Sequence, residues 1–435
     1  MGLPRSFKLF RTTMSGEKIY EGVFAVHKPQ GVSSADVIRT LQKHFNPSQL
    51  FRPWLESERA RRDRESQHQR RRRRTQRLDV KIGHGGTLDP LATGVLVAGV
   101  GKGTKYLNNF LGCTKTYETV VLFGAETDTY DVLGKVVRRA PYEHVTREAV
   151  ERALDQFRGK IMQRPPIFSA LRVQGKRLYE YAREGLEPPV EIKARPVEVT
   201  DLRVVEWYEP GTHEYKWPEE EAMGEEREVA ERMLRKEDAL PVAEAAGEET
   251  EAEGSASGKR KAEASPPPPP PAAAAAEESS KVEEGSGLAV AAEESVDAPA
   301  AKKVKVSEDG ESVPAQSEEA LAPAPAAESA SAPETTEKKE EAPVRPQPAA
   351  VKITMTVSSG FYVRSLAHDL GKAVGSCGLM SSLVRSRQAD FVLEPEKVLE
   401  YKDLEAGEEV WGPKVQQFLQ DWEDKRAAQN EAEEK

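Results

Sequence analysis

A long low-complexity stretch, residues 209–348, interrupts this chain of 435 residues and most constrains what the chain can fold into. It contains six consecutive prolines at 266–271, followed by five alanines, and it is otherwise rich in Glu, Ala and Ser. Such a segment has too little apolar surface to offset the entropy lost on ordering. We therefore predict a disordered acidic insert over 209–349. The fold must then close across it, which is tolerable because loop-closure entropy grows slowly with loop length.

The acidic insert also changes how the net charge should be interpreted. The whole chain has a formal net charge of −10. Residues 217–348 hold 14 basic and 32 acidic residues, whereas the rest of the chain holds 49 basic and 41 acidic residues. The foldable part is therefore basic, which is typical of proteins that act on nucleic acid.

The cysteine count and the hydropathy exclude several classes of protein. Cys113 and Cys377 are the two cysteines, and neither lies in a CxxC or Cys/His pattern. They indicate a reducing compartment and no zinc site. No apolar run approaches the roughly 20 residues of a membrane span, so we expect no membrane partner.

The stretch 81–105 carries the strongest candidate for chemistry. Gly85 and Gly86 provide a flexible approach to Asp89, which precedes a proline, and the β-branched run 95–100 predicts a buried strand. We expect the carboxylate on a tight turn at the mouth of that strand, where it can act as nucleophile or base. An aspartate before proline is also a common turn former, so the pattern alone leaves both interpretations open.

The sequence GHGGTLDPLATGVL around this aspartate resembles the signature of the TruB family of tRNA pseudouridine synthases. It is most similar to the eukaryotic stand-alone branch, which isomerises uridine 55 in the tRNA T-loop. The resemblance implies that Asp89 is the catalytic nucleophile and that His84 faces the RNA. It also implies an α+β fold, a mixed and largely antiparallel sheet flanked by helices, and a reaction without cofactor or metal.

Further segments resemble the same family in the same order. By these matches Lys28 supports the wall of the active site, Tyr117 stacks on the extracted base, and Tyr362 lines the base pocket. The match SSGFYVRSLAHDLG also implies that Arg364 pairs with the catalytic carboxylate. A guanidinium in that place would keep the carboxylate ionised and fix its direction. Leu383 matches the apolar residue beneath the uracil.

Hydrophobic periodicity predicts the local elements around these motifs. We expect strands at 23–26, 117–124 and 351–357, and sheet over 191–208. We expect helices from the Ser33 cap to Phe45, over 146–158, and after Arg364. Asp128 and Asp131 are interpreted as turn residues rather than metal ligands. The predicted organisation is an N-terminal extension 1–21, a catalytic domain in two parts (22–208 and 350–395), the insert 209–349, and a C-terminal helix with a polar tail (396–435).

Residues 46–80 are an insertion relative to compact bacterial members of the family. Between positions 52 and 81 there are 12 basic and 5 acidic residues, including five consecutive arginines at 70–74. Without apolar periodicity, the segment is predicted to be a solvated, disordered loop. Its place directly before the catalytic turn also predicts contact with tRNA phosphates, because each neutralised phosphate releases counterions. The two interpretations are compatible.

The expected partner is tRNA, through its T-loop, with other RNAs that carry a T-loop-like hairpin as further candidates, and we expect a monomer. Arg5, Lys8 and Arg11 precede the first acidic residue, as in a weak mitochondrial presequence or an unstructured terminus. Basic clusters at 259–261 and 302–305 resemble nuclear localisation signals. The predicted locations are nucleus and mitochondrion, with the cytoplasm as a further candidate.

Two other functions stay open. One is a catalytic subunit directed by a guide RNA. The form GGTLDPLATG and the lack of a recognisable C-terminal RNA-binding module argue against it. The other is a non-catalytic factor that binds or folds tRNA. The presence of Asp89, Tyr117 and Arg364 argues against that alternative, since a pure binder has no need of the carboxylate.

Overall fold

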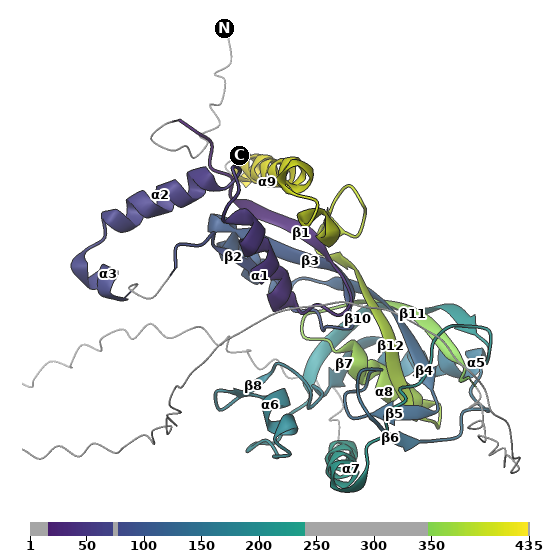
Figure 1. The fold of residues 1–435 in the computed structure, drawn as a ribbon. Helices are drawn as coiled ribbons and strands as arrows, with labels where there is room; N and C mark the ends of the chain where they lie inside the picture. The colour runs from purple at the N-terminus through teal and green to yellow at the C-terminus, as the bar shows by residue number, and fades with distance from the viewer. Residues whose placement is uncertain (1–15, 73–76, 240–346, 434–435) are drawn as a thin grey trace, which may run out of the picture. The chain divides into compact units, whose positions relative to one another are not determined.

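The computed structural model describes residues 16–72, 77–239 and 347–433, which form a large sheet with helices packed on it (Figure 1). The strands of this sheet are β1 (Gly22–Lys28), β2 (Ile82–His84), β3 (Thr93–Val100), β4 (Lys115–Phe123), β7 (Gly159–Gln163), β10 (Arg195–Tyr208), β11 (Ala350–Val357), β12 (Gly378–Gln388), β13 (Phe391–Val392) and β14 (Leu399–Glu400). Two small hairpins lie outside it, β5 (Ala125–Thr127) with β6 (Val136–Arg139), and β8 (Arg172–Val173) with β9 (Lys176–Arg177).

The ten strands of the large sheet run in the order β14-β1-β3-β12-β4-β11-β10-β7, with β2 paired to β3 and β13 to β12. The pairs β1–β14 and β3–β12 are parallel. The other pairs of this sheet are antiparallel. The predicted fold class, an α+β protein with a mixed and largely antiparallel sheet, is confirmed.

The helices are distributed along the chain between these strands. They are α1 (Ser34–Phe45), α2 (Arg52–Asp63), α3 (Gln67–Arg72), α4 (Leu107–Gly112), α5 (Arg147–Leu154), α6 (Leu178–Arg183), α7 (Gly224–Ala239), α8 (Val363–Ala373) and α9 (Glu408–Glu433). Three short 3₁₀ helices are η1 (Gly101–Tyr106), η2 (Asp155–Phe157) and η3 (Tyr401–Leu404). One core cluster joins α5 and α8 to β4, β10, β11 and β12, and a second joins α1 and α9 to β1 and β3.

Several local elements form where the sequence predicts them. The Ser33 hydroxyl caps α1 by accepting a hydrogen bond from the Asp36 amide, and Val37, Leu41 and Phe45 are buried on one face. This is the outcome of a capping residue followed by an apolar stripe at helical spacing. The expected strand 351–357 is β11, and it pairs with β4 and β10. The predicted C-terminal helix is α9, and its side chains Trp411, Val415 and Leu419 are buried.

The predicted boundary of the insert at 209 is wrong. Residues 209–239 are folded: the Trp217 indole donates to the Phe123 carbonyl at 2.8 Å, and α7 buries Leu234 beside Tyr130. Aromatic side chains can bury enough apolar area to order a segment that polar residues alone would leave in solvent. Residues 240–346, which include both basic clusters proposed for nuclear import, lie outside the described residues. The strands that flank the insert, β10 and β11, are adjacent and antiparallel.

The prediction of a disordered loop between α1 and β2 is also wrong for most of its length, because residues 52–72 form α2 and α3. The Phe51 ring stacks on Phe45 with centroids 4.4 Å apart, and Trp54 is buried in the same cluster. Farther along α2, Arg61 pairs with glutamates three residues before it and four residues after it. Such pairs stabilise an exposed helix. Residues 73–76, and the N-terminal extension up to residue 15, lie outside the described residues.

None of the described helices has the length and apolar character needed to cross a bilayer. The C-terminal segment contributes to the main sheet, because β14 adds to the edge of β1 before α9 begins.

Candidate active site

A cleft of about 390 Å³ opens where the segment before β3 meets β4, β12 and the start of α8. The cleft is lined by five of the site residues predicted from the sequence: Asp89, Tyr117, Tyr362, Arg364 and Leu383. They come from both sides of the insert. A fold that places β12 between β3 and β4 is what brings them to one place.

The turn that carries Asp89 is fixed by the segment between β1 and α1. The Ser34 hydroxyl donates to the Leu88 carbonyl at 3.0 Å and accepts from the Leu88 amide at 2.8 Å. The Gly31 amide donates to the Pro90 carbonyl at 2.8 Å. The residues on either side of the aspartate are therefore held, while its side chain remains 38% exposed. A fixed but accessible carboxylate is suited to nucleophilic attack.

Lys28 acts on the same turn from inside the protein. Its side chain is fully buried, and its ammonium donates to the carbonyls of Pro29 at 2.8 Å and Pro90 at 3.3 Å. Burial lowers the pKa of Lys28 to about 8, and the nearby charge of Asp89 opposes that shift. Lys28 does not line the cleft, so its contacts are those of a support for the turn.

Arg364, in the first turn of α8, connects three segments. Its Nε lies 3.0 Å from Oδ2 of Asp89, and its two terminal nitrogens donate to the carbonyls of Thr129 at 3.1 Å and Phe168 at 2.8 Å. Asp131 lies on the other side, with Oδ2 3.8 Å from Nη1 of the same guanidinium. Arg364 is 7% exposed, so these interactions are only weakly screened by water.

Asp131 is also the turn residue that the sequence predicts. Its Oδ1 accepts from the Thr129 hydroxyl at 2.8 Å and from the Leu133 amide at 3.0 Å, in the turn between β5 and β6. Burial raises the pKa of Asp131, and the charge of Arg364 opposes that shift. Two carboxylates thus flank one guanidinium, and the buried one anchors it while the exposed one faces the cleft.

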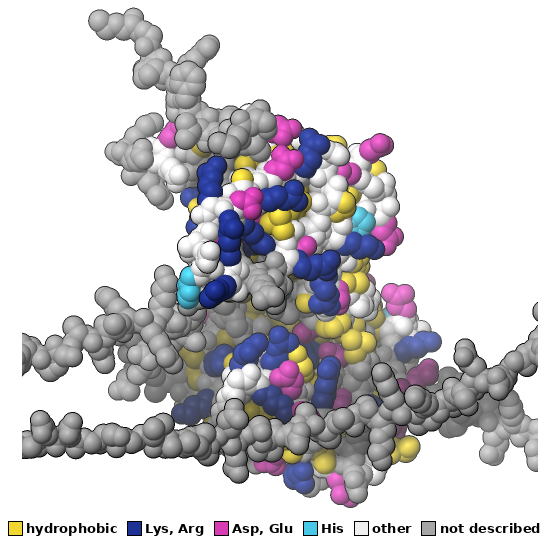
Figure 2. Space-filling model, turned by 60° about the vertical axis from the view of Figure 1, so that its left-hand side comes forward, with side chains coloured by type: hydrophobic (Ala, Val, Ile, Leu, Met, Phe, Trp, Pro, Cys, Tyr) yellow, Lys and Arg dark blue, Asp and Glu magenta, His cyan; other side chains and the backbone are white. Residues whose placement is uncertain are grey.

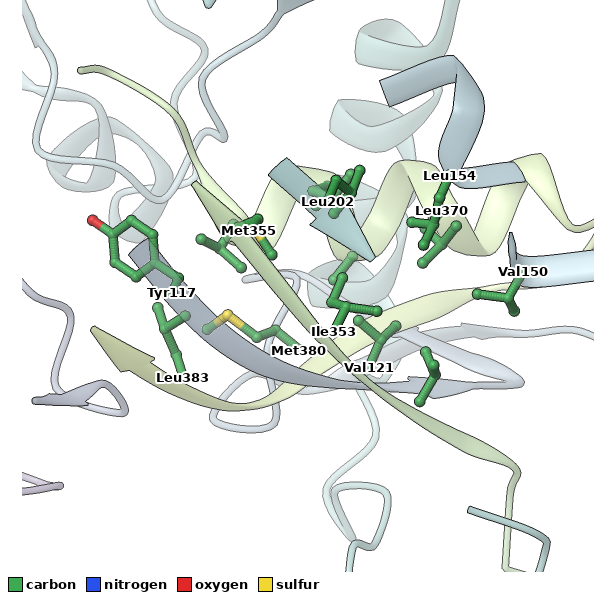
Figure 3. Packing of buried hydrophobic residues seen from close by; sticks show 14 of the residues in the cluster. Tyr117, Val121, Val150, Leu154, Leu202, Ile353, Met355, Leu370, Met380 and Leu383 are labelled. Atoms are coloured by element: carbon green, nitrogen blue, oxygen red, sulfur yellow. The ribbon is translucent and has the colours of Figure 1, made fainter. Parts of the chain in front are cut away.

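The apolar wall of the cleft is formed by Tyr117 and Leu383. Figure 3 shows these side chains next to each other at one end of the buried cluster, beside Met355 and Met380. Tyr117 is 8% exposed, with its hydroxyl directed away from the cluster in this view. A planar ring beside an aliphatic side chain is a suitable surface for a nucleobase.

Tyr362 precedes α8 and is held through its backbone. The Gln163 side chain accepts from the Tyr362 amide at 2.7 Å and donates to the Tyr362 carbonyl at 2.9 Å. The last residue of β7 therefore sets where α8 begins, and with it the position of Arg364 in the first turn.

The floor of the cleft contains cationic side chains that sequence reasoning missed. Arg385 is 1% exposed and donates to the carbonyls of Val95 at 2.7 Å and Gly86 at 3.3 Å. Lys115 also lines the cleft, and burial lowers its pKa. Arg385 follows Leu383 by two positions on β12, so strand alternation places both on the same face. This two-residue spacing from Leu383 is the sequence feature from which Arg385 could have been predicted.

Comparison with known proteins identifies the family of this chain. Residues 70–218 match the family model described as "TruB family pseudouridylate synthase (N terminal domain)". The chain is 36% identical over 392 residues to "tRNA pseudouridine synthase 4" of Schizosaccharomyces pombe, an alignment that covers 88% of this chain and 83% of the relative. The chain belongs to the TruB family of pseudouridine synthases. The Saccharomyces cerevisiae protein of the same name is 31% identical, over 92% of this chain and 84% of that protein.

A third TruB relative matches over a shorter range. The mouse "Pseudouridylate synthase TRUB1" is 40% identical over 190 residues, which is 43% of this chain and 51% of that protein. The expected membership of the TruB family is therefore confirmed along most of the chain, beyond the segments quoted from the sequence.

The structure brings five of the seven predicted site residues of this TruB protein into one cleft, and Lys28 and His84 are the exceptions. His84 lies on β2, partly buried, and burial lowers the pKa of its imidazole. Its expected role at the RNA stays a prediction. Within the described residues, no group of three or more His, Cys, Asp or Glu side chains is arranged to hold a metal ion.

Proposed function

We propose that this protein converts uridine 55 of the tRNA T-loop to pseudouridine, with Asp89 as the nucleophile and without a guide RNA. The reaction class follows from its family: the chain is a tRNA pseudouridine synthase, an isomerase, like the fungal relatives. The observation that carries the proposal beyond the reaction class is the contact between Arg364 Nε and Asp89 Oδ2 at 3.0 Å at the mouth of the cleft.

That contact supports a nucleophilic role for two reasons. The guanidinium pairs with one carboxylate oxygen and fixes its direction, while the second oxygen remains available. The turn around the aspartate is held by backbone contacts to α1 and to the preceding loop, so little reorganisation is needed before attack. The aspartate is thus prepared for covalent catalysis rather than used as a simple turn former.

The size and lining of the cleft support an extruded nucleotide as substrate. Taking a base out of its stack costs a few kcal/mol, and stacking on an aromatic side chain returns about 1–3 kcal/mol. Tyr117 and Leu383 offer that surface within reach of the same cleft as Asp89. In the reaction the N1 glycosidic bond breaks, the uracil rotates, and a C5 glycosidic bond forms while C5 loses a proton and N1 gains one. No electron is gained or lost overall.

The position of the target comes from the resemblance of the signature around Asp89 to the branch that modifies uridine 55. On the same basis we propose that other RNAs with a T-loop-like hairpin are accepted, that the protein acts as a monomer, and that it works in nucleus and mitochondrion.

The test uses purified full-length protein and unmodified tRNA transcript, with no other RNA present. Pseudouridine is mapped at single-nucleotide resolution for wild type, for Asp89→Asn, and for Asp390→Asn. Asp390 is an exposed aspartate outside the cleft and makes the matched control. We expect product at position 55 from wild type and from Asp390→Asn, and none from Asp89→Asn, with tRNA binding retained by all three.

Product from Asp89→Asn at the wild-type rate would exclude Asp89 as the nucleophile. Product at a different uridine would exclude the assignment of position 55. Tight tRNA binding by wild type without any product would favour the alternative of a binding or folding factor.

A further inference from the structure

The helices α2 and α3 form a projection that is anchored in the fold by its first turn. Pro53 and Trp54 are buried, and the Trp54 indole donates to Glu21 at 2.9 Å. From residue 56 to residue 71 no side chain is buried. A helix of 12 residues is about 18 Å long, so the far end of α2 lies well away from that anchor. Figure 1 shows α2 and α3 extending from the part of the fold where α1 and β2 lie.

Charge is distributed unevenly along this projection. In α2 itself the basic residues are nearly matched by acidic ones, and they pair within the helix. Within α2 Arg61 contacts Glu58, and Arg62 lies 3.5 Å from Glu58; Arg61 also contacts Glu65, which follows the end of the helix. Paired charges on one helix produce little field beyond it, so α2 serves as a rigid spacer rather than as a binding surface.

The excess of positive charge begins where α2 ends. Residues 64–81 contain eight basic and two acidic residues. Both acids are already engaged, since Glu65 pairs with Arg61 and Asp79 accepts from the Asn46 side-chain amide at 2.9 Å. Figure 2, turned so that the side of α2 and α3 comes forward, shows Lys and Arg side chains gathered on the upper part of this face.

Four described arginines of this segment are exposed: Arg64 where α2 ends, Arg70 and Arg71 on α3, and Arg77 on the return toward β2. Lys81 then leads directly into β2, which pairs with β3, and the chain continues through the glycines to the catalytic turn. An RNA bound in the cleft therefore lies close to β2, the strand that directly follows this basic segment. Guanidinium groups bind phosphate through two parallel hydrogen bonds, which suits a sugar-phosphate backbone.

We infer that α3 and the return at Arg77 form a second RNA-binding surface, which holds tRNA phosphates outside the T stem-loop. This inference rests on the proposed function. The cleft, at about 390 Å³, accommodates a single extruded nucleotide. The basic surface lies beyond α2, which is about 18 Å long and has its buried anchor near its start, at Trp54. Phosphates near the target base are thus contacted at the cleft, and more distant phosphates of the folded tRNA at this surface.

The test compares wild type with Arg70→Gln/Arg71→Gln/Arg77→Gln on two substrates, full-length tRNA and the isolated T stem-loop. Each phosphate contact adds about 0.7 to 0.9 to the slope of log affinity against log salt, so three contacts add about 2 to 3. Raising salt from about 50 to 200 mM should then weaken tRNA binding by wild type roughly 20- to 40-fold more than binding by the variant. The rate at saturating tRNA should stay within about twofold, and the KM for the stem-loop should not change.

A matched control removes three exposed arginines elsewhere, Arg147, Arg152 and Arg203. In Figure 1, α5, which carries the first two, lies at the opposite side of the fold from α3. A second variant with lysine at the three projection sites keeps the charge, and it should retain most of the salt dependence. If the lysine variant retains the salt dependence of tRNA binding, then the loss of that dependence in the glutamine variant reflects lost charge rather than misfolding.

The inference is overturned if the glutamine variant and the control have the same salt slope on tRNA. It is also overturned if the stem-loop is weakened as much as whole tRNA, because the phosphates bound would then lie within the T-arm. Failure of the proposed function is a separate result, since the salt slope of tRNA binding is measured without turnover.

Discussion

The guanidinium of Arg364 offers the sharpest test of the reasoning, through Arg364→Lys. The substitution keeps the positive charge but replaces a planar group with five N–H donors by a single ammonium. Three acceptors converge on the arginine from separate segments: Asp89 Oδ2 at 3.0 Å, the Thr129 carbonyl at 3.1 Å and the Phe168 carbonyl at 2.8 Å. One ammonium cannot reach all three.

The magnitude follows from the hydrogen bonds that the lysine cannot make. If the lysine keeps Asp89, two carbonyls are left without their donor, and each costs about 1–2 kcal/mol, the lower part of the usual range because the cleft admits water. We expect the free energy of unfolding to fall by about 2–4 kcal/mol. If the carboxylate also shifts by about 1 Å, the rate of the chemical step should fall about 100-fold.

Two measurements check this prediction. Urea unfolding gives the change in stability, and single-turnover pseudouridine formation with enzyme in excess gives the rate of the chemical step. The control is Arg203→Lys, in which an exposed arginine that pairs with Asp201 is replaced. If Arg364→Lys keeps a free energy of unfolding within about 0.5 kcal/mol of wild type and a rate within about threefold, the view that guanidinium geometry organises the site is refuted.

Three further predictions follow from other parts of the fold. The pKa of Lys28 is about 8 in the folded protein and 10.5 in the unfolded chain, so between these pH values the unfolded chain binds the proton that the folded chain has released. Stability should therefore rise with pH across this window more steeply for wild type than for Lys28→Met. The same pH dependence of the urea midpoint in both proteins would contradict this prediction. Asp131→Asn removes the buried carboxylate 3.8 Å from the guanidinium and should lower the single-turnover rate about tenfold with unchanged tRNA affinity. An unchanged rate would show that the second carboxylate is dispensable. A Cβ on Gly103 would lie 1.8 Å from the Gly22 carbonyl oxygen, so Gly103→Ala should lower stability by more than about 3 kcal/mol. Gly112→Ala meets no atom within 4 Å and should melt near wild type, which makes it the control.

Local patterns predicted the elements whose formation depends on neighbouring residues. The cap at Ser33, the stripe of α1 and the strand β11 are examples, because capping and periodicity act over a few positions. The same reasoning failed for residues 52–72, where burial of Phe51 and Trp54 against a distant cluster stabilises helices in a very polar segment. It failed again at 209–239, where Trp217 binds a carbonyl of β4.

The sequence by itself determined the family, five of the residues that line the cleft and the interruption of the fold. These depend on residue identity and on motifs read along the chain. Only the tertiary structure decided which groups meet. The order β3-β12-β4 places Arg385 beneath the segment that leads to Asp89, and the β5–β6 turn brings Asp131 to Arg364. Such contacts join segments far apart in sequence, and they are selected by strand pairing and burial, which no local pattern encodes.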